Sequence, residues 1–416
     1  MNHSRHGETE VPPAGPLPHD PVAMTRRLVR TPSVNPVLED GGAGEERAAR
    51  LVAGWLAGWG YATRTIEVAP GRYNVVGRLG AGRGPVLLLN GHLDTVGVSG
   101  MPDPFSGAVR DGRLYGRGAA DMKAGVACIL ATAARVAREE VPGGLIIAMT
   151  ADEEHASVGM EALVAEGISA DAAVVCEPTG LAVMPAHKGF LWIDAHVRGR
   201  AAHGSQPGAG IDAVTRAGHL LVAFEAEGER LARDTGHPLL GPASVHAGTI
   251  SGGSAPSVYP DSCHVVFERR TLPGETAAKV MREAKSVLAE AQRRCPGLEA
   301  RLEPGLFRAA TEVPASAPLV QELVRACARS PRGLMPRGPG AAIPGEVAGM
   351  SAWVDACFLN ESGTPAVCFG PGSIAQAHTT GEWVDVSEID ACADILTDFS
   401  RRFLAGRTNP HERRDG

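Results

Sequence analysis

The sequence of 416 residues has no apolar stretch approaching the roughly 20 residues that a membrane-spanning helix needs. It also lacks a basic stripe, since 40 Lys and Arg stand against 47 Asp and Glu and the formal net charge is -7. Nucleic-acid binding requires basic groups that neutralise phosphates. We therefore expect a protein that acts on small molecules, with no nucleic-acid partner and no membrane partner.

Cysteine pairs of the CxxC type are absent as well. The eight cysteines occur mostly inside apolar runs such as AVVCEP and PAVCFG, which is typical of small buried residues in a reducing compartment. The first twenty residues, MNHSRHGETEVPPAGPLPHD, lack the apolar core of a secretory signal. These features predict a cytoplasmic protein.

Short apolar runs alternate with helical patterns along much of the chain, which favours an α/β fold with a mostly parallel sheet. Continuous apolarity predicts strands buried on both faces. The predicted strands are RYNVVGRL, GPVLLLN, GLIIAM, DAAVVCE and TPAVCFG, and helices are predicted near 45–59, 121–140 and 317–329. The glycine-rich segment 77–84 precedes a strand instead of linking strand to helix, so we interpret it as a hairpin turn and not as a nucleotide loop.

The middle of the chain has a different pattern: strand, helix, two strands, helix, strand. That order is the split βαβ, ferredoxin-like arrangement, with one small sheet and two helices. The chain is long enough for two domains, because single cores stop growing near roughly 250 to 300 residues. We therefore predict a catalytic domain formed by residues 21–187 and 310–405, interrupted by an inserted α+β domain at 188–309.

Acidic residues and histidines follow the predicted strands of the first domain. Open α/β sheets place their sites at the carboxyl ends of the strands. An isolated histidine is more often a core residue and a Glu-Glu pair more often a solvated helix end, but such readings would need a coincidence at each of five places. The residues are His92, Asp94, Asp121, Glu153, Glu154, Glu177 and His378.

Imidazole nitrogens and carboxylate oxygens suit a pair of zinc ions about 3.5 to 4 Å apart, as in aminopeptidase-like sites. Two histidines cannot fill two coordination shells, so at least one carboxylate must bridge, and Asp121 is the natural candidate. A metal-bound water needs a base. Of the adjacent Glu153 and Glu154, one can coordinate and the other can act as general acid and base.

Several motifs, in this order, make the chain recognisable: GHLDTV, GRGAADMKAG, TADEEHASVG, CEPTG, HKGF, GRAAHGSQP, RRTLPGE and FGPGSIAQAHTTGEW. Over about residues 24–404 the chain resembles the acetylornithine deacetylase and succinyl-diaminopimelate desuccinylase family of di-zinc amidohydrolases. That family also contains glutamate carboxypeptidases, aminoacylases and dipeptidases.

The resemblance implies a role for each candidate. It implies that Asp121 bridges two metals, most simply Zn²⁺ with Co²⁺ or Mn²⁺ as alternatives, that Glu153 is the general base, and that Asp94 orients His92. The other implied metal ligands are His92 and Glu177 at one ion and Glu154 and His378 at the other.

The resemblance also implies that the inserted domain is a lid and a homodimer surface. His203 is carried over as a donor to the carbonyl oxygen of the scissile amide, and Arg270 as the clamp for a substrate carboxylate. A surface ion pair is an alternative for Arg270. Ser257 stands where family members often have asparagine, and we assign it and Gly370 to substrate binding.

The resulting hypothesis is metal-dependent hydrolysis of the amide bond of an N-acyl amino acid by a metal-bound water. A dipeptidase, a glutamate-type carboxypeptidase or a broad aminoacylase would share the same chemistry. A catalytically silent metal-binding dimer is the non-enzymatic alternative, and the presence of Glu153 argues against it because a structural site has no use for a base. A nicotinamide enzyme would require a strand followed by GxGxxG and a helix, which we do not find.

Overall fold

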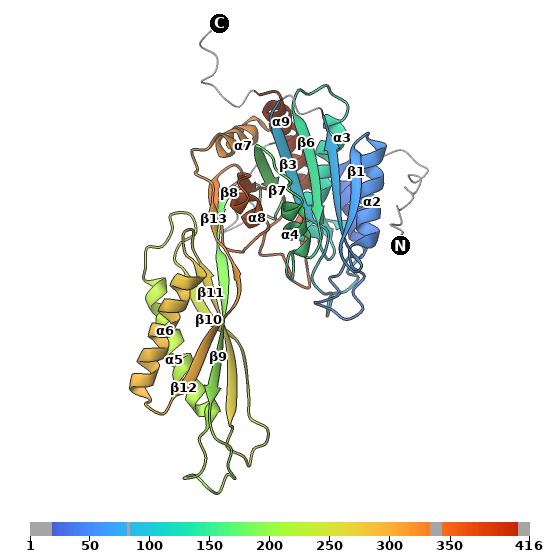
Figure 1. The fold of residues 1–416 in the computed structure, drawn as a ribbon. Helices are drawn as coiled ribbons and strands as arrows, with labels where there is room; N and C mark the ends of the chain where they lie inside the picture. The colour runs from blue at the N-terminus through green and yellow to red at the C-terminus, as the bar shows by residue number, and fades with distance from the viewer. Residues whose placement is uncertain (1–18, 81–83, 333–342, 407–416) are drawn as a thin grey trace, which may run out of the picture. The chain divides into compact units, whose positions relative to one another are not determined.

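The structure, a computed structural model of the chain, describes residues 19–80, 84–332 and 343–406 (Figure 1). It separates two compact units. The first takes in the described residues of Met1–Pro185, Val313–Ala348 and Val354–Gly416, and the second Ala186–Glu312 and Gly349–Trp353. Among the described helices, none combines the length and apolarity that crossing a membrane requires.

The first unit is built on a sheet with the strand order β1-β2-β6-β3-β7-β15-β8. The four strands β6, β3, β7 and β15 are parallel to one another, β2 and β8 flank them in the antiparallel direction, and β1 pairs antiparallel with β2. This mostly parallel central sheet confirms the predicted α/β class. The bounds are β1 Ala62–Ala69, β2 Arg72–Leu79, β3 Val86–His92, β6 Gly144–Thr150, β7 Ala172–Val175, β8 Val183–His187 and β15 Ala366–Cys368.

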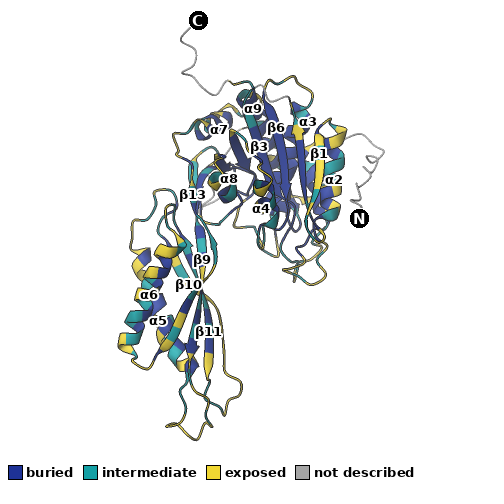
Figure 2. Cartoon of the chain, viewed as in Figure 1, coloured by how far each residue is buried: buried dark blue, intermediate teal, exposed yellow. Residues whose placement is uncertain are grey.

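Helices cover both faces of this sheet with their buried sides, and this accounts for the continuous apolar runs in its strands. Every residue of β6 is buried, and Figure 2 shows β3 and β6 in the colour of buried residues. In Figure 1, α4 and α8 lie in front of the sheet and α3 and α9 behind it. The helices are α1 Pro21–Val29, α2 Glu46–Gly58, α3 Ala124–Val136, α4 Val158–Ala165, α7 Pro318–Arg329, α8 Ala356–Glu361 and α9 Val386–Leu404. Three further short strands, β4 Ala108–Arg110, β5 Arg113–Tyr115 and β16 Trp383–Asp385, form a small separate sheet, and β14 Val347–Met350 pairs with β8.

The second unit has a four-stranded antiparallel sheet with the order β10-β11-β9-β12. Strand β11 alternates between buried and less buried residues, as expected when one face packs on a core and the other is open. The buried face packs on α5 Ala213–Ala232 and α6 Ala277–Arg294. The strands are β9 Gly189–Arg198, β10 Ser244–Gly252, β11 Ser262–Thr271 and β12 Glu299–Arg308, and β13 Thr311–Glu312 pairs with the end of β8.

Two expectations about the first unit are wrong. The helix predicted at 121–140 begins only at Ala124, because Asp121 and Met122 adopt non-helical φ/ψ values in an irregular turn, and it ends at Val136. The hairpin predicted at 77–84 does not exist, because β6 lies between β2 and β3 in the sheet. Residues 81–83 of that segment lie outside the described residues.

Candidate metal centre

Parallel strands bring four of the predicted site residues to one edge of the sheet. His92 is the last residue of β3, and Glu153 and Glu154 follow β6. Glu177 comes two residues after β7. Because β6, β3 and β7 are neighbours that run in the same direction, their carboxyl ends lie together.

Asp121 is held in the irregular turn Ala119–Lys123 by a carboxylate from far along the chain. Glu382, which is 1% exposed, accepts the backbone N–H groups of Gly118 (3.1 Å), Ala120 (2.8 Å) and Asp121 (3.1 Å). An ion pair at 2.6 Å joins Glu382 to Arg117. The sequence analysis did not single out Glu382, although its place in the motif AQAHTTGEW is a signal that could have found it.

Asp121 touches both predicted histidine ligands, one with each oxygen. Its Oδ1 lies 3.2 Å from Nε2 of His92, and its Oδ2 lies 3.4 Å from Nε2 of His378. The same nitrogen of His378 lies 3.0 Å from Oε2 of Glu154. Ligand atoms of His92, Asp121 and Glu154 all lie within 4.8 Å of one another. A carboxylate between two imidazoles is the arrangement that a bridging ligand requires.

Two carboxylate oxygens of this cluster are buried without a hydrogen-bond partner in the described part of the chain: Oε1 of Glu154 and Oε1 of Glu177. Burial, followed by the charge of Asp121, raises the pKa of Glu154 to about 7, and burial raises the pKa of Glu177 to about 8. Crowded carboxylates in a low-dielectric site are stabilised in the charged form by cations. The donor set therefore fits divalent metal ions.

Glu153 has different surroundings. Burial, followed by the charge of Glu177, raises the pKa of the Glu153 carboxyl well above its ordinary value. Its backbone N–H donates to Oδ1 of Asp94 at 3.1 Å. A carboxylate with a raised pKa can hold a proton near neutral pH, which is what a general acid and base needs.

Asp94 contacts both His92, at the end of β3, and the two glutamates Glu153 and Glu154. Nδ1 of His92 lies 3.0 Å from the main-chain oxygen of Asp94 and 3.6 Å from its Oδ1. The nearer partner is thus the carbonyl and not the carboxylate. The carboxylate accepts the N–H of Glu153 and, at 3.3 Å, that of Glu154, so Asp94 positions both glutamates as well as His92.

A buried ionic network supports the loop that carries the glutamates. Arg72, at the start of β2, contacts Glu45 through Nε at 2.8 Å and Asp152 through Nη1 at 2.8 Å. Asn35 donates to Oδ2 of Asp94 at 2.9 Å and to Asp152 at 3.0 Å. Asp152 has a φ of 68°, which is rare for a residue other than glycine. Nothing in the local sequence pairs these residues, and the sequence analysis missed them.

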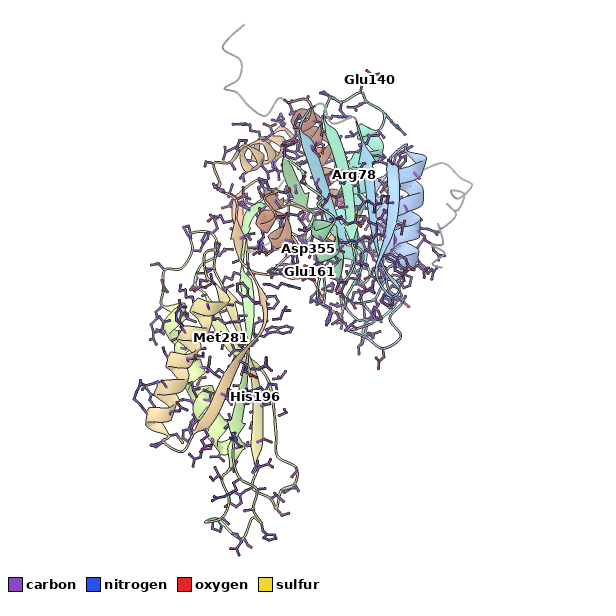
Figure 3. All side chains as sticks on the ribbon, in the orientation of Figure 1. Arg78, Glu140, Glu161, His196, Met281 and Asp355 are labelled. Carbon is purple, nitrogen blue, oxygen red and sulfur yellow. The ribbon has the colours of Figure 1, made fainter. Side chains whose placement is uncertain are left out.

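Asp355 and Gly370 complete the surroundings of the cluster. Burial raises the pKa of Asp355 to about 7, and its Oδ2 accepts the hydroxyl of Thr150 at 3.2 Å. Figure 3 labels Asp355. The N–H of Gly370 donates to Oγ1 of Thr179 at 3.1 Å, and a Cβ at Gly370 would lie 2.5 Å from the carbonyl oxygen of Glu177. Close packing against Glu177 explains the glycine, and the substrate-binding role of Gly370 stays a prediction.

Three of the predicted residues lie in the second unit. The N–H of Ser205 donates to Nδ1 of His203 at 3.2 Å, and the hydroxyl oxygen of Ser205 lies 2.8 Å from the same nitrogen, so Ser205 occupies the Nδ1 side of the ring. The N–H of Gly204 donates to the carbonyl oxygen of Ser257 at 2.7 Å, so the segments of His203 and Ser257 lie side by side.

Arg270 already has partners inside the second unit. Its Nε lies 2.7 Å from Oε1 of Glu268, and its guanidinium carbon lies 5.5 Å from the centroid of the Phe190 ring. The side chain is 31% exposed. A carboxylate ligand at Arg270 would therefore compete with, or add to, an existing ion pair.

Comparisons with known proteins bear on the family of the chain. The family model for peptidase family M20/M25/M40 matches residues 88–402. Acetylornithine deacetylase from Myxococcus xanthus is 32% identical over 337 residues, which cover 80% of this chain and 84% of that protein.

Two solved structures share the fold. The M20 family metallo-carboxypeptidase Sso-CP2 from Sulfolobus solfataricus has a TM-score of 0.74 at 15% identity, covering 92% of this chain and 99% of that one. The Bacillus subtilis YXEP protein, described as a dinuclear metal binding peptidase from the M20 family, has a TM-score of 0.66 at 16% identity, covering 92% and 97%.

Proposed function

Because the chain belongs to peptidase family M20/M25/M40, we propose that it is a metal-dependent hydrolase that cleaves the amide bond of an N-acyl amino acid. The family makes it a hydrolase of amide bonds. The deacylase activity is the proposal, and it is supported by the acetylornithine deacetylases among its relatives, at 32% and 28% identity.

One observation carries the proposal: Asp121 lies between His92 and His378 and touches each with a different carboxylate oxygen. We propose that His92 and Glu177 hold one divalent ion, that Glu154 and His378 hold a second, and that Asp121 bridges the two. Within the described residues, Oε1 of Glu154 and Oε1 of Glu177 have no hydrogen-bond partner, which supports this assignment because each is available to a cation. Zn²⁺ suits the imidazole and carboxylate ligands.

The chain's own residues would move the protons. When bound, the two ions would polarise the amide carbonyl and acidify a water molecule. Glu153 would take a proton from the attacking water and return it to the nitrogen of the leaving amine. Asp94 would keep Glu153 in place through the 3.1 Å bond to its backbone N–H.

Residues of the second unit would handle the rest of the substrate. We propose that Nε2–H of His203 donates to the carbonyl oxygen of the scissile amide, since Nδ1 is already occupied by Ser205. Arg270 would bind the carboxylate of the substrate, for which a guanidinium offers two parallel donors. Ser257, and Gly370 of the first unit, remain proposed substrate contacts.

The proposal is tested by hydrolysis of a panel of N-acyl amino acids, dipeptides and the matching methyl esters. We expect free N-acyl amino acids to be the best substrates, activity to disappear after chelation, and activity to return with Zn²⁺ or Co²⁺. Arg270→Met should raise KM for the free acid and leave KM for its methyl ester, the poorer substrate, unchanged. The carboxylate is already charged in the ground state, so the loss of its clamp weakens substrate binding.

Two results would count against the proposal. Faster cleavage of dipeptides than of any N-acyl amino acid would make the protein a dipeptidase. Equal effects of Arg270→Met on acid and ester would place the carboxylate site elsewhere.

A further inference from the structure

The open face of the four-stranded sheet carries a second cluster of metal-binding residue types, far along the chain from the first. His196 on β9 lies directly across from His264 on β11 in the antiparallel register. Asp194 is two residues before His196 and therefore points to the same face. Glu303 on β12 lies across from Asp194. Figure 3 labels His196 on this sheet.

The side chains of this cluster converge. Nε2 of His264 lies 2.7 Å from Oδ1 of Asp194, and Nε2 of His196 lies 3.4 Å from Oε2 of Glu303. The two imidazole rings stack with centroids 4.6 Å apart and an interplanar angle of 6°. Asp194, His196 and His264 each offer one ligand atom within 4.8 Å of the other two.

We propose that Asp194, His196 and His264 form a binding site for one transition-metal ion of the Zn²⁺ class, with Glu303 as a fourth ligand. An ion with tetrahedral bonds of about 2.0–2.2 Å keeps its ligand atoms about 3.3–3.6 Å apart. The observed separations bracket that range, so rotation of side chains suffices. Two imidazoles with one or two carboxylates are a ligand set that zinc accepts.

The surrounding charge also suits a cation. Asp194 and Glu303 bring two negative charges, and Arg301, which lies across from His196, is paired with Oε1 of Glu303 at 2.7 Å. That leaves Oε2 of Glu303 facing His196. The side chains are partly exposed, from 31% for Asp194 to 43% for Glu303, so an ion can reach them from solvent.

The ligands come from two or three adjacent strands, so a bound ion would cross-link them. A site built on strands keeps its geometry better than one built on loops. This inference uses none of the residues proposed for catalysis, and it stands whether or not the proposed function is correct.

The test is equilibrium dialysis of the full chain against Zn²⁺, with metal analysis of the protein. The variant His196→Ala/His264→Ala should bind one ion fewer per chain than the wild type. His246→Ala, which removes an exposed histidine from β10 of the same sheet, is the matched control and should bind as many ions as the wild type. The single change His264→Gln should lower the affinity of the protein for the same ion while strand β11 stays intact.

Circular dichroism establishes that each variant is folded, and the histidine variants should also keep amide hydrolysis, since none of the histidines changed belongs to the proposed catalytic site. The inference is overturned if the double variant and the control bind the same number of ions. It is equally overturned if the ion lost in the double variant is the one that Glu154→Ala removes.

Discussion

Two neighbouring glutamates after β6 differ in what surrounds their carboxylates. Glu154 lies 3.0 Å from His378 with one oxygen and buries the other without a partner in the described residues. The Glu153 carboxyl instead has its pKa raised by burial and then by the charge of Glu177. Both residues lie in the turn that follows β6, so their difference rests on these contacts and not on the alternation of a strand. One sequence position can therefore supply a ligand and the next a proton carrier.

The proposed role of His203, in the second unit, leads to a separate prediction. If His203 donates only to the oxygen that gains negative charge, its bond strengthens in the transition state. His203→Ala should then lower kcat and kcat/KM together by about 100- to 1,000-fold, the cost of one such donor elsewhere. Steady-state kinetics on the best N-acyl amino acid measures this.

The control for that experiment is His246→Ala, which should leave both kinetic constants unchanged. An increase in KM with an unchanged kcat in His203→Ala would mean that the ring binds the ground state of the substrate and does not stabilise the oxyanion.

Contacts between secondary-structure elements also support the site: Arg72 of β2 holds the loop that follows β6. The side chain of Arg72 is 6% exposed and that of its partner Glu45 is fully buried. Breaking a buried ion pair by removing one partner costs about 3–5 kcal/mol of stability. Arg72→Met should therefore lower the free energy of unfolding by about that amount and reduce activity, because Asp152 loses the contact that holds it.

Arg64→Met is the matched control, since Arg64 on neighbouring β1 pairs with Glu166 while its side chain is 65% exposed. An exposed pair contributes about 0–1 kcal/mol. Urea denaturation followed by circular dichroism compares the two variants, and equal losses would show that the network around Arg72 does not support the site.

The strands of the central sheet were predictable because their burial on both faces leaves a run of apolar residues in the sequence. Continuous apolar runs marked β2, β3, β6, β7 and β15, because strands covered on both faces need no polar residues. The start of α3 was not predictable, because Glu382 takes the backbone N–H groups of the preceding turn from 261 or more residues away. Arg72 and Asp152 are 80 residues apart, and no local pattern relates them. Helix α9, by contrast, has a visible apolar period that the sequence analysis overlooked.

At the scale of the whole molecule, strand β10 is an edge with most of its residues exposed. Open edges are either covered or paired with another chain. We predict a homodimer that forms through residues 188–309. Light scattering at micromolar protein should give twice the chain mass of 43.2 kDa.

A surface variant sharpens that prediction. Ile250 on β10 is 53% exposed, and Ile250→Lys should shift the mass towards the monomer. Val109→Lys, at a 44% exposed valine on β4 of the other unit, should not. A wild-type protein that is strictly monomeric and fully active would rule out a functional dimer.

The most direct test of the account compares Glu153→Gln with Glu154→Gln, measuring metal content and amide hydrolysis on the same preparations. We predict that Glu153→Gln keeps both ions and loses about 100- to 10,000-fold in kcat, the usual contribution of a general acid or base. Glu154→Gln should lose metal as well as activity, because it removes a ligand beside His378. Full activity in Glu153→Gln, or a loss of metal equal to that of Glu154→Gln, would contradict the assignment of the two glutamates.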